Sequence, residues 1–445
     1  MSDKDKILEE ILHLVERYYE IAYKAIESKK DIVSYSGAVF DSEELKSVVE
    51  ALLYGRLAHG KYTLLFENNF ARSIGAKHAI FVNSGSSANL LAIATLFSEQ
   101  LDDSLKLRPG DEVITPALTF PTTLSPLLIY GLKPVFIDVE LSTLNIDLSM
   151  LDKAVSDRTK AIFVPHTLGN PVDMEFLREF ADSHGLLLIE DSCDALGSKF
   201  NGKYVGTFGH FGTFSFYPAH QITTGEGGML VTNDDRLAKT AKSIRDWGRA
   251  CIMPSCNPLT CGDKECPKSY SFSGKKIYDL PDDYDKRYTY INIGLNVQAT
   301  ELQAAFGLKQ LGKLSAFCNT RRRNFKLLMD ELEEFDKYFI LPEAHPKSEP
   351  CWFAFPITLK PNIPFRRSVL LKWLVKNKID YRLPFAGNIL KQPGYKNIGY
   401  RVVGDLKNTD YAMYNTFFVG VYPGLKAEDI AYVADTIRKF ITNNG

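Results

Sequence analysis

The stretch AIFVNSGSSANLLAIATLF, residues 79–97, places a short apolar run, a Ser-Gly-Ser turn and an apolar helix in immediate succession. That order is typical of a strand that passes directly into a helix in an α/β protein. The helix would begin with free N–H groups, and Gly85 would let a ligand approach the backbone closely. An ordinary capped helix explains the same residues without a ligand. The stretch therefore predicts a strand–helix unit and makes Gly85 and Ser86 candidates for binding a phosphate.

Short β-rich runs recur on both sides of this unit and are separated by helical stretches such as MEFLREFADSHG. The runs are DEVITP (111–116), KPVFIDV (133–139), KAIFVPH (160–166), LLLIED (186–191), GTFSFY (212–217) and GMLVTN (228–233). Because apolar strands that alternate with helices are buried on both faces, they favour a mostly parallel sheet sandwiched by helices. We therefore expect an α/β fold with a mostly parallel sheet, and a smaller α+β C-terminal domain.

Three segments are expected along the chain. Residues 1–60 form an N-terminal helical segment, residues 61–317 the large α/β domain, and residues 318–445 the small C-terminal domain. Residues 248–290 interrupt the pattern, because they are polar, rich in Cys, Pro, Gly and Asp, and without periodicity. A loop of that length is usually functional or disordered.

The composition is that of an ordinary globular protein: 445 residues, 45% hydrophobic and 24% charged, with a formal net charge of -1. This balance gives no reason to expect a nucleic-acid partner. We expect no membrane span and no signal peptide, since no run of about 18 apolar residues occurs and the N-terminus has a charged helical period. A cytoplasmic protein is therefore expected, and clustered thiols in that compartment indicate metal or redox chemistry.

Asp191 follows a buried run at the edge where open α/β sheets bind their ligands. A pyridine cofactor needs a carboxylate against its ring nitrogen, although a helix cap explains the residue equally well. Phe120, in PALTFPTT, is a candidate to stack on such a ring, with core packing as the alternative. His166 is a candidate for the same pocket, with a structural role as the alternative.

Taken together and in this order, the motifs resemble those of the fold-type I vitamin B6 enzymes, in particular the nucleotide-sugar aminotransferases and their dehydratase relatives. The resemblance spans nearly the whole chain and rests on NSGSSANLLA, HTLGNPVDM, EDSCDALG, GTFSFYPAHQITTGEGG, GLNVQATELQAAFGLKQL, FAGNILKQPGY and TFFVGVYPGL. It is far more specific than any single motif.

The resemblance implies a role for each candidate. Contacts to the cofactor phosphate would come from Gly85, Ser86 and Ser215. Phe120 would stack on the cofactor ring, and Asp191 would pair with the ring nitrogen. The family builds its sites between two subunits, so the resemblance also implies a homodimer in which Asn296 reaches the phosphate across the interface.

The loop GTFSFYPAHQITTGEGG, residues 212–228, resembles the loop that carries the cofactor lysine in this family, but His220 stands at the lysine position. No lysine occurs between Lys203 and Lys239. Because histidine cannot form a Schiff base, the expected cofactor is noncovalently bound pyridoxamine 5′-phosphate. His220 would be the base that takes the C4′ proton in the 3-dehydration of a 4-keto sugar. The alternative is a catalytically silent sugar-nucleotide sensor or structural subunit.

Two kinds of dehydratase share this histidine. One hydrolyses its product, releases ammonia and needs no metal. The other resembles the iron–sulfur 3-dehydratases of CDP-4-keto-6-deoxy-D-glucose, whose [2Fe-2S] ligands follow the pattern C-X57-C-X1-C-X7-C. The second kind would receive electrons from an NADH-dependent flavin and iron–sulfur reductase, and would act in 3,6-dideoxysugar biosynthesis for surface polysaccharides such as lipopolysaccharide O-antigen.

Three of the four pattern positions are cysteines in this chain: Cys193, Cys251 and Cys261. The fourth position holds Met253, whose thioether is a poor substitute for a thiolate in an iron–sulfur site. Cys256 and Cys266 lie in the same loop, and we favour Cys256 because it lies between two matched ligands. A structural zinc bound by the four loop cysteines, and cysteines without function, are the alternatives.

The remaining features concern the substrate and the other thiols. Cys193 lies two residues after Asp191, which favours a metal close to the cofactor over a remote zinc site. Cys318 and Cys351 fit no pattern, and we interpret them as ordinary buried thiols.

Arg382 and Asn388, in DYRLPFAGNILKQPGY, match a stretch that the dehydratase subgroup uses near the sugar nucleotide. A CDP-linked keto-sugar is expected only because the cysteine-bearing subgroup most often uses it, with GDP- and dTDP-sugars as the alternatives. The run RRR, 321–323, is expected to be a solvated charged face.

Overall fold

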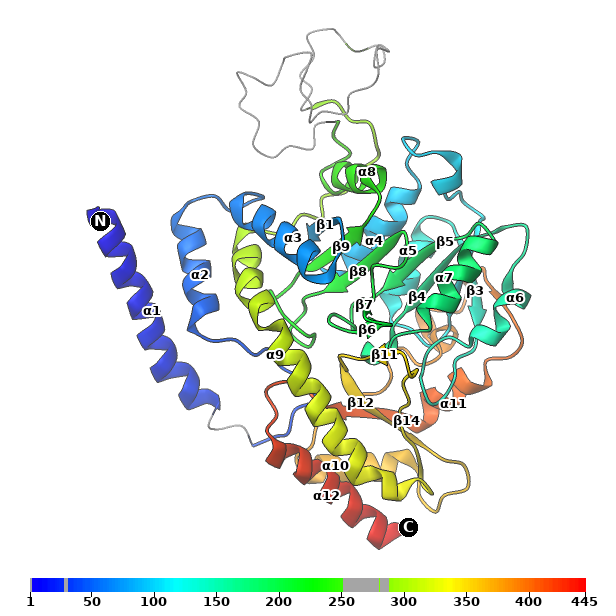
Figure 1. Cartoon of the computed structure of the whole chain (residues 1–445). Helices are drawn as coiled ribbons and strands as arrows, with labels where there is room; N and C mark the ends of the chain where they lie inside the picture. Colours follow the sequence, from blue (N-terminus) through cyan, green and yellow to red (C-terminus); the bar gives the residue numbers. More distant parts are fainter. Residues whose placement is uncertain (1, 28–30, 251–279, 281–287) are drawn as a thin grey trace.

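The computed structural model describes residues 2–27, 31–250, 280 and 288–445, and Figure 1 shows their arrangement. The helices are α1 (Asp3–Glu27), α2 (Ser42–Leu53), α3 (Lys61–Ile74), α4 (Gly85–Leu96), α5 (Pro121–Ile129), α6 (Leu151–Ala154), α7 (Met174–Ser183), α8 (Asp235–Arg245), α9 (Glu301–Leu332), α10 (Arg367–Lys376), α11 (Lys407–Asn415) and α12 (Ala427–Asn444). The sequence periodicity predicts helices over 43–54, directly after the Ser-Gly-Ser turn and from 300 to about 335, and these are α2, α4 and α9. The second helix is capped by Asp41 in a capping box with Glu44.

Eight strands form the main sheet, in the order β1-β9-β8-β5-β4-β2-β3-β13. They are β1 (His78–Val82), β2 (Glu112–Pro116), β3 (Lys133–Ile137), β4 (Thr159–Pro165), β5 (Leu187–Asp191), β8 (Phe211–Ser215), β9 (Gly228–Thr232) and β13 (Arg401–Val402). β9 runs antiparallel to both of its neighbours, and the other pairs are parallel. The prediction of a mostly parallel sheet is therefore confirmed.

The sheet is buried on both faces because successive strand residues enter different cores. In β4, Phe163 packs into the core that α4, α5 and α8 cover, whereas Ile162 and Val164 pack into the core that α6 and α7 cover. Nearer β1, the second face is closed by α3 and α9, around Phe66 and Phe70. This double covering explains why the predicted strands are almost uniformly apolar.

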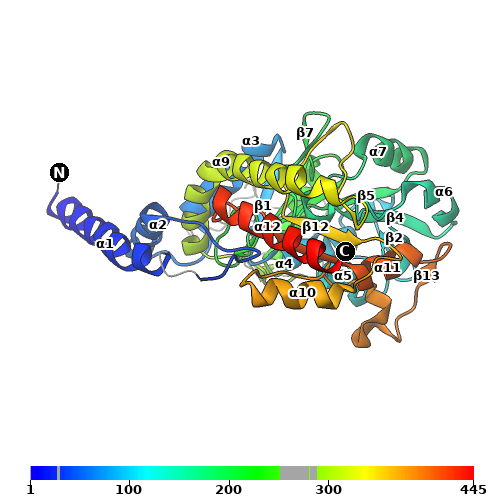
Figure 2. The same cartoon turned by 90° about the horizontal axis from the view of Figure 1, so that it is seen from below.

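The C-terminal part of the chain builds a small three-stranded sheet from β10 (Phe339–Ile340), β12 (Ala354–Leu359) and β14 (Thr416–Gly420). It packs against α9, α10 and α12, and Figure 2 shows these three helices alongside it. A second small sheet joins β6 (Lys199–Phe200), β7 (Lys203–Tyr204) and β11 (Ser348–Glu349). The same C-terminal part also supplies β13, which pairs in parallel with β3 at the edge of the main sheet.

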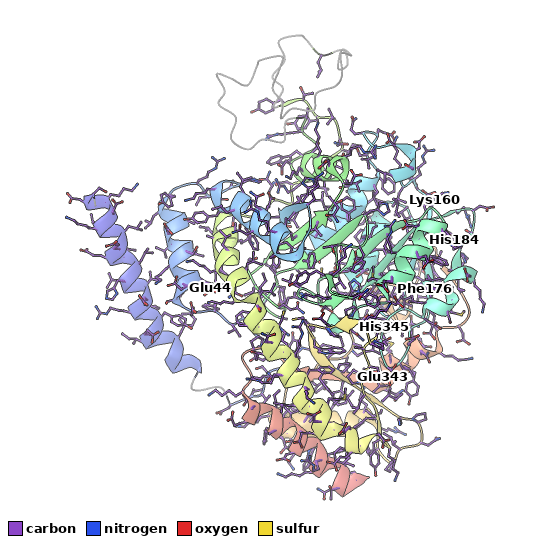
Figure 3. The ribbon with its side chains drawn as sticks, in the orientation of Figure 1. Glu44, Lys160, Phe176, His184, Glu343 and His345 are labelled. Carbon is purple, nitrogen blue, oxygen red and sulfur yellow. The ribbon has the colours of Figure 1, made fainter. Side chains whose placement is uncertain are left out.

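The N-terminal helices α1 and α2 lie at the outer edge of the molecule in both views (Figures 1 and 2). α2 is anchored to α9 by the buried carboxylate of Glu44, labelled in Figure 3, which pairs with Lys313 at 2.6 Å and accepts a hydrogen bond from Gln310. Among the described residues, no helix is both long enough and apolar enough to cross a lipid bilayer.

Candidate functional site

A cavity of about 740 Å³ opens where β2, β4, β5 and β8 end. These are the carboxyl ends of parallel strands, where ligands bind in open α/β sheets. The structure brings nine of the predicted site residues to the wall of this cavity: Gly85, Ser86, Phe120, His166, Asp191, Cys193, Ser215, His220 and Arg382. Residues far apart in the sequence therefore form one site.

The start of α4 meets the ends of β5 and β8 at one wall of the cavity. Ser84 caps α4 by accepting a hydrogen bond from the Ser87 amide, so the helix dipole points its positive end at the cavity. A Cβ placed on Gly85 would lie 2.5 Å from the Ser215 Cβ and 2.9 Å from the Cys193 Sγ. Only glycine fits at this position, and the arrangement is suited to holding a phosphate.

The carboxylate of Asp191 is buried and held at a fixed orientation below the cavity. Its Oδ2 accepts hydrogen bonds from Asn89 Nδ2 at 2.8 Å and from Thr123 Oγ1 at 2.7 Å. Its Oδ1 accepts the Cys193 amide at 3.2 Å. Thr213 donates to Asn89 Oδ1 at 2.6 Å, which fixes the amide that holds the carboxylate. A carboxylate so oriented is suited to pairing with a protonated ring nitrogen.

Phe120 lies at the N-cap of α5 and is half exposed, facing the cavity. The centroids of the Phe120 and Phe385 rings are 5.9 Å apart, and the two rings are perpendicular, with an interplanar angle of 90°. Phe385 adopts a positive φ of 45°, which is rare for a bulky side chain. The two rings form an aromatic wall that can cover one face of a planar cofactor.

His220 lies deep in the cavity, with its imidazole 13% exposed and its ring 5.3 Å from that of Phe353. Its Nδ1 faces the Asp194 Oδ1 at 3.5 Å and has no hydrogen-bond partner among the described residues. Burial, with a further contribution from Arg321, lowers the pKa of His220 to about 3. Burial, with a further contribution from Asp191, raises the pKa of Asp194 to about 8. At neutral pH the imidazole is therefore neutral, as a general base must be.

The turn that carries His220 is held by a buried arginine. Arg321 on α9 donates from Nη2 to the carbonyl of His220 at 2.9 Å and from Nη1 to that of Phe353 at 2.9 Å. It also reaches the carbonyls of Ala219 and Trp352. The expectation of a solvated charged face at 321–323 is wrong for Arg321, because carbonyl groups from two distant segments compensate its burial.

Two predicted residues lie outside the cavity wall. Asn388 is buried, donates to the Asp410 Oδ1 at 2.7 Å and accepts the Leu390 amide, so its side chain is engaged by the protein. Asn296 is exposed and forms an isolated bridge with Asp246. The roles predicted for both stay predictions.

His166 and Arg382 line the cavity and also have protein partners. The Val172 amide donates to the His166 Nδ1 at 3.1 Å, and the His166 Nε2 lies 3.2 Å from the Glu190 Oε2. Both ring nitrogens of His166 are thus engaged. The guanidinium of Arg382 stacks over the Tyr35 ring at 4.1 Å, and its Nη1 pairs with the Asp380 Oδ1 at 2.5 Å.

The predicted metal ligands are only partly described. Cys193 lies at the cavity wall beside Gly85, and burial raises its thiol pKa well above the usual value. Cys251, Cys256 and Cys261 lie outside the described residues, as do Met253 and Cys266. Within the described part of the chain, no group of three or more His, Cys, Asp or Glu side chains is placed to hold a metal ion.

Sequence reasoning missed Asp194, Arg321, Asn89 and Thr123. Asp194 follows Asp191 by three residues in EDSCDALG, so a second acid beside the first was the available signal. Asn89, one turn into α4, was a weaker signal. Arg321 and Thr123 gave none, because their partners come from distant parts of the chain.

A family model described as the DegT/DnrJ/EryC1/StrS aminotransferase family matches residues 39–258 and 268–438. The chain is 44% identical to the lipopolysaccharide biosynthesis protein RfbH of Salmonella typhimurium, over 99% of both chains. It is 45% identical to the dTDP-4-dehydro-2,6-dideoxy-D-glucose 3-dehydratase of Saccharopolyspora spinosa, over 92% of this chain and 86% of that one.

The fold is likewise similar to a solved structure of GDP-4-keto-6-deoxy-D-mannose-3-dehydratase from E. coli, which holds hydrated PLP. The TM-score is 0.80 at 32% identity, covering 91% of this chain and 99% of the other. The likeness therefore extends over both the main sheet and the C-terminal part.

Proposed function

The chain belongs to the DegT/DnrJ/EryC1/StrS aminotransferase family and is an enzyme, and from this membership we propose that it is a pyridoxamine 5′-phosphate-dependent 3-dehydratase of a nucleotide-linked 4-keto-6-deoxyhexose. The observation that carries the proposal is His220. It lies in the cavity as a neutral imidazole, and no lysine is among the described residues that line that cavity. A site with a base and no amine is suited to removing a hydroxyl, whereas a site with the amine tethers the cofactor.

The residues present fit the cofactor. Gly85, Ser86 and Ser215 line the cavity at the start of α4, where backbone N–H groups are free, and we propose that these three residues hold the phosphate. Asp191 would hold the ring nitrogen and the aromatic wall of Phe120 would cover the ring. When bound, pyridoxamine phosphate supplies an amine that condenses with a ketone and a ring that withdraws electrons.

His220 would take the proton from C4′ of the cofactor. Its Nδ1 faces Asp194, so Nε2 is the nitrogen left for the proton transfer. When Asp194 is ionised, its negative charge favours the tautomer that keeps the ring proton on Nδ1, and the lone pair then resides on Nε2. Arg321 fixes the backbone of this turn, and Phe353 limits the movement of the ring. Asp194 is therefore a positioning residue in the proposed reaction.

Replacing His220 tests this assignment. With pyridoxamine phosphate and a nucleotide-linked 4-keto-6-deoxyhexose, the wild type should remove the C-3 hydroxyl of the sugar. His220→Asn should bind the cofactor but catalyse this removal at least about 100-fold more slowly. His220→Lys should instead tether pyridoxal phosphate and absorb as a Schiff base. The proposal is wrong if His220→Asn turns over at the wild-type rate, or if the wild type binds no vitamin B6 cofactor.

The nucleotide is a finer proposal. The sequence resemblance favours CDP, whereas two similar enzymes are named for dTDP- and GDP-linked sugars. We propose a CDP-linked keto-sugar, with kcat/KM for the CDP-, dTDP- and GDP-linked substrates as the measurement. A value for dTDP or GDP more than tenfold above that for CDP would overturn this choice and leave the dehydration itself intact.

The [2Fe-2S] cluster and its NADH-dependent flavin and iron–sulfur reductase are also proposed. Support comes from Cys193, whose Sγ lies at the cavity wall next to the site proposed for the cofactor phosphate, so that electron transfer to the cofactor would be short. Cys251, Cys256 and Cys261 would complete the set. The competing function, favoured by Met253 at a ligand position, is a cluster-free dehydratase that releases ammonia.

Anaerobic purification separates these two functions. About two irons per chain, broad visible absorption and their loss in Cys256→Ala but not in Cys266→Ala would support the cluster and its fourth ligand. Absence of iron, together with ammonia released stoichiometrically with the sugar product, would support the cluster-free enzyme. Iron lost only in Cys266→Ala would support the cluster but reassign the ligand.

A homodimer is proposed from the position of Asn296. It is exposed in one chain, close to Ile293, whose side chain is 98% exposed. Further exposed apolar residues lie on α2 and just after it: Leu52, Leu53, Tyr54 and Leu57. These two segments flank the same buried network, because His59 contacts Arg245 and the adjacent Asp246 bridges Asn296. A second copy covering this surface would bring Asn296 to the partner's phosphate.

A further inference from the structure

Two cysteines outside the cofactor cavity lie side by side in the core. Cys318 is on α9, and Cys351 is in the segment that leads into β12. Both are free thiols, and their Sγ atoms are 2.6 Å apart. Cys318 is 4% exposed and Cys351 is not exposed. The sequence places them 33 residues apart, so only the fold brings them together.

The surrounding backbone is shaped to admit this pair. Gly197 has a φ of +88°, and a Cβ there would lie 2.3 Å from the Cys318 Sγ and 3.5 Å from the Cys351 Sγ. Ser198 accepts the Cys351 amide at 2.7 Å, which fixes the second cysteine under the same turn. Any side chain at Gly197 would therefore displace the thiols.

The two thiols differ chemically. The hydrogen bond from Cys351 and the positive charges of Arg322 and Arg321 lower the pKa of Cys318. Burial raises the pKa of Cys351 well above its usual value. Cys318 is therefore the thiol of the pair that ionises more readily, which suits it to the role of the nucleophile and leaves Cys351 as the resolving cysteine.

We propose that Cys318 and Cys351 form a redox pair that closes to a disulfide when a two-electron oxidant such as hydrogen peroxide reaches it. The Cys318 thiolate attacks one peroxide oxygen, the O–O bond breaks, and a sulfenic acid and hydroxide result. The Cys351 sulfur then attacks the Cys318 sulfur, the S–O bond breaks, and water leaves with the thiol proton. The two thiols lose two electrons and two protons, and the peroxide becomes two waters.

The cross-link would join two supports of the histidine turn. Arg321, one turn after Cys318, holds the His220 carbonyl, and Phe353, two residues after Cys351, packs on the His220 ring. The disulfide would tie these supports together without touching the cavity itself. Because it also restricts the unfolded chain, the oxidised protein should have a Tm several degrees above that of the reduced protein.

Peptide mapping of the full chain tests the pair. The protein is treated with hydrogen peroxide, denatured in N-ethylmaleimide and digested with trypsin. We expect residues 314–321 joined to residues 348–366, lighter than the two peptides together by two hydrogens and separated by dithiothreitol. Cys318→Ala and Cys351→Ala should each lose this species and the rise in Tm.

Two results would overturn the proposal. In the first, Cys318 and Cys351 both carry maleimide although the peroxide has oxidised other thiols of the chain. In the second, Cys318 is joined by a disulfide to a different cysteine. The wild-type map decides between these results even if a variant fails to fold. It also does not depend on the proposed enzymatic activity.

Discussion

His220 is a neutral imidazole beside Asp194, a carboxyl group of raised pKa. The protonation state of Asp194 therefore determines which ring nitrogen of His220 carries the proton. With Asp194 protonated, its carboxyl group faces the His220 Nδ1 at 3.5 Å and favours the ring proton on Nε2, where that proton blocks the base. With Asp194 ionised, the carboxylate favours the ring proton on Nδ1, and Nε2 is free. Because the Asp194 pKa is about 8, the competent form accumulates as the pH rises through that value.

We therefore expect kcat to rise about tenfold between pH 7 and pH 9, as the ionised fraction of Asp194 increases through its pKa of about 8. In Asp194→Asn this rise should vanish, because an amide does not titrate. A pH–rate profile of both proteins, with pyridoxamine phosphate saturating, makes the measurement. A rise of the same size in Asp194→Asn would mean that another group titrates.

At this scale the sequence predicted the residues that a motif carries, and it missed those whose role arises from a neighbour. Gly85, Asp191 and His220 were found because each stands in a recognisable pattern, and the fold brings them to one cavity. Asp194 and Arg321 are ordinary charged residues in the sequence. Their functions depend on contacts with segments that no local pattern relates to them.

The start of α4 packs closely against the end of β8, at the cavity wall where we propose that the cofactor phosphate lies. In Gly85→Ala the new Cβ would lie 2.5 Å from the Ser215 Cβ, so the helix start or the strand end must shift. We expect the Kd for pyridoxamine phosphate to rise at least about tenfold, or 1.4 kcal/mol. Absorbance titration measures it.

Gly312→Ala on α9 is the matched control, since a Cβ there meets nothing within 4 Å. It should leave the cofactor Kd unchanged and stabilise the helix by up to about 1 kcal/mol. Equal effects of the two substitutions on Kd would contradict the placement of the phosphate at α4.

The end of α8 holds a buried ion-pair network. Arg245 pairs with Glu67 on α3 at 2.7 Å and with Asp246 at 2.8 Å. Removing one member of a buried pair leaves an uncompensated charge, so Arg245→Met should lower the free energy of unfolding by about 3–5 kcal/mol. Urea titration measures the change.

Arg236→Met, on the same helix, is the control. Arg236 is 57% exposed and pairs with an exposed aspartate, Asp102, so its replacement should cost less than about 1 kcal/mol. If Arg245→Met lowers the free energy of unfolding no more than Arg236→Met does, the proposed contribution of the buried network to stability is contradicted.

Most elements follow from periodicity, and the exceptions have a physical cause. The second helix is expected over 43–54 and observed over Ser42–Leu53, and the helix expected from 300 to about 335 is α9 (Glu301–Leu332) plus a final 3-10 turn. β13 was missed because two residues carry no periodicity of their own. The antiparallel direction of β9 was missed because an apolar run does not encode the direction of its partner.

For the whole molecule, the proposed dimer makes a testable prediction. The mass in solution should be about twice the 50.1 kDa of one chain. Ile293→Asp places a charge where the second copy would lie, and should shift the protein toward the monomer and weaken cofactor binding, because Asn296 acts across the interface in the proposal. Analytical ultracentrifugation at micromolar concentrations measures this.

Val375→Asp on α10 serves as the matched control, since Val375 is 60% exposed but lies in the C-terminal part, away from the proposed interface. Its mass should stay that of the dimer. A monomeric wild type, or a monomer produced equally by Val375→Asp, would contradict the proposed surface.

The pairing of β1 with β9 also bears on the order in which the protein can be made. Among the described strands of the main sheet β1 pairs with β9 alone, and the ribosome makes Val82 146 residues before its partner Gly228. At usual rates of synthesis, an apolar strand waits roughly 7–30 s for its neighbour. During that time the nascent chain exposes an unpaired apolar strand that can aggregate. The yield of folded enzyme in a cell should therefore depend on how fast residues 83–227 are translated, and on chaperones that bind β1 until β9 has been made.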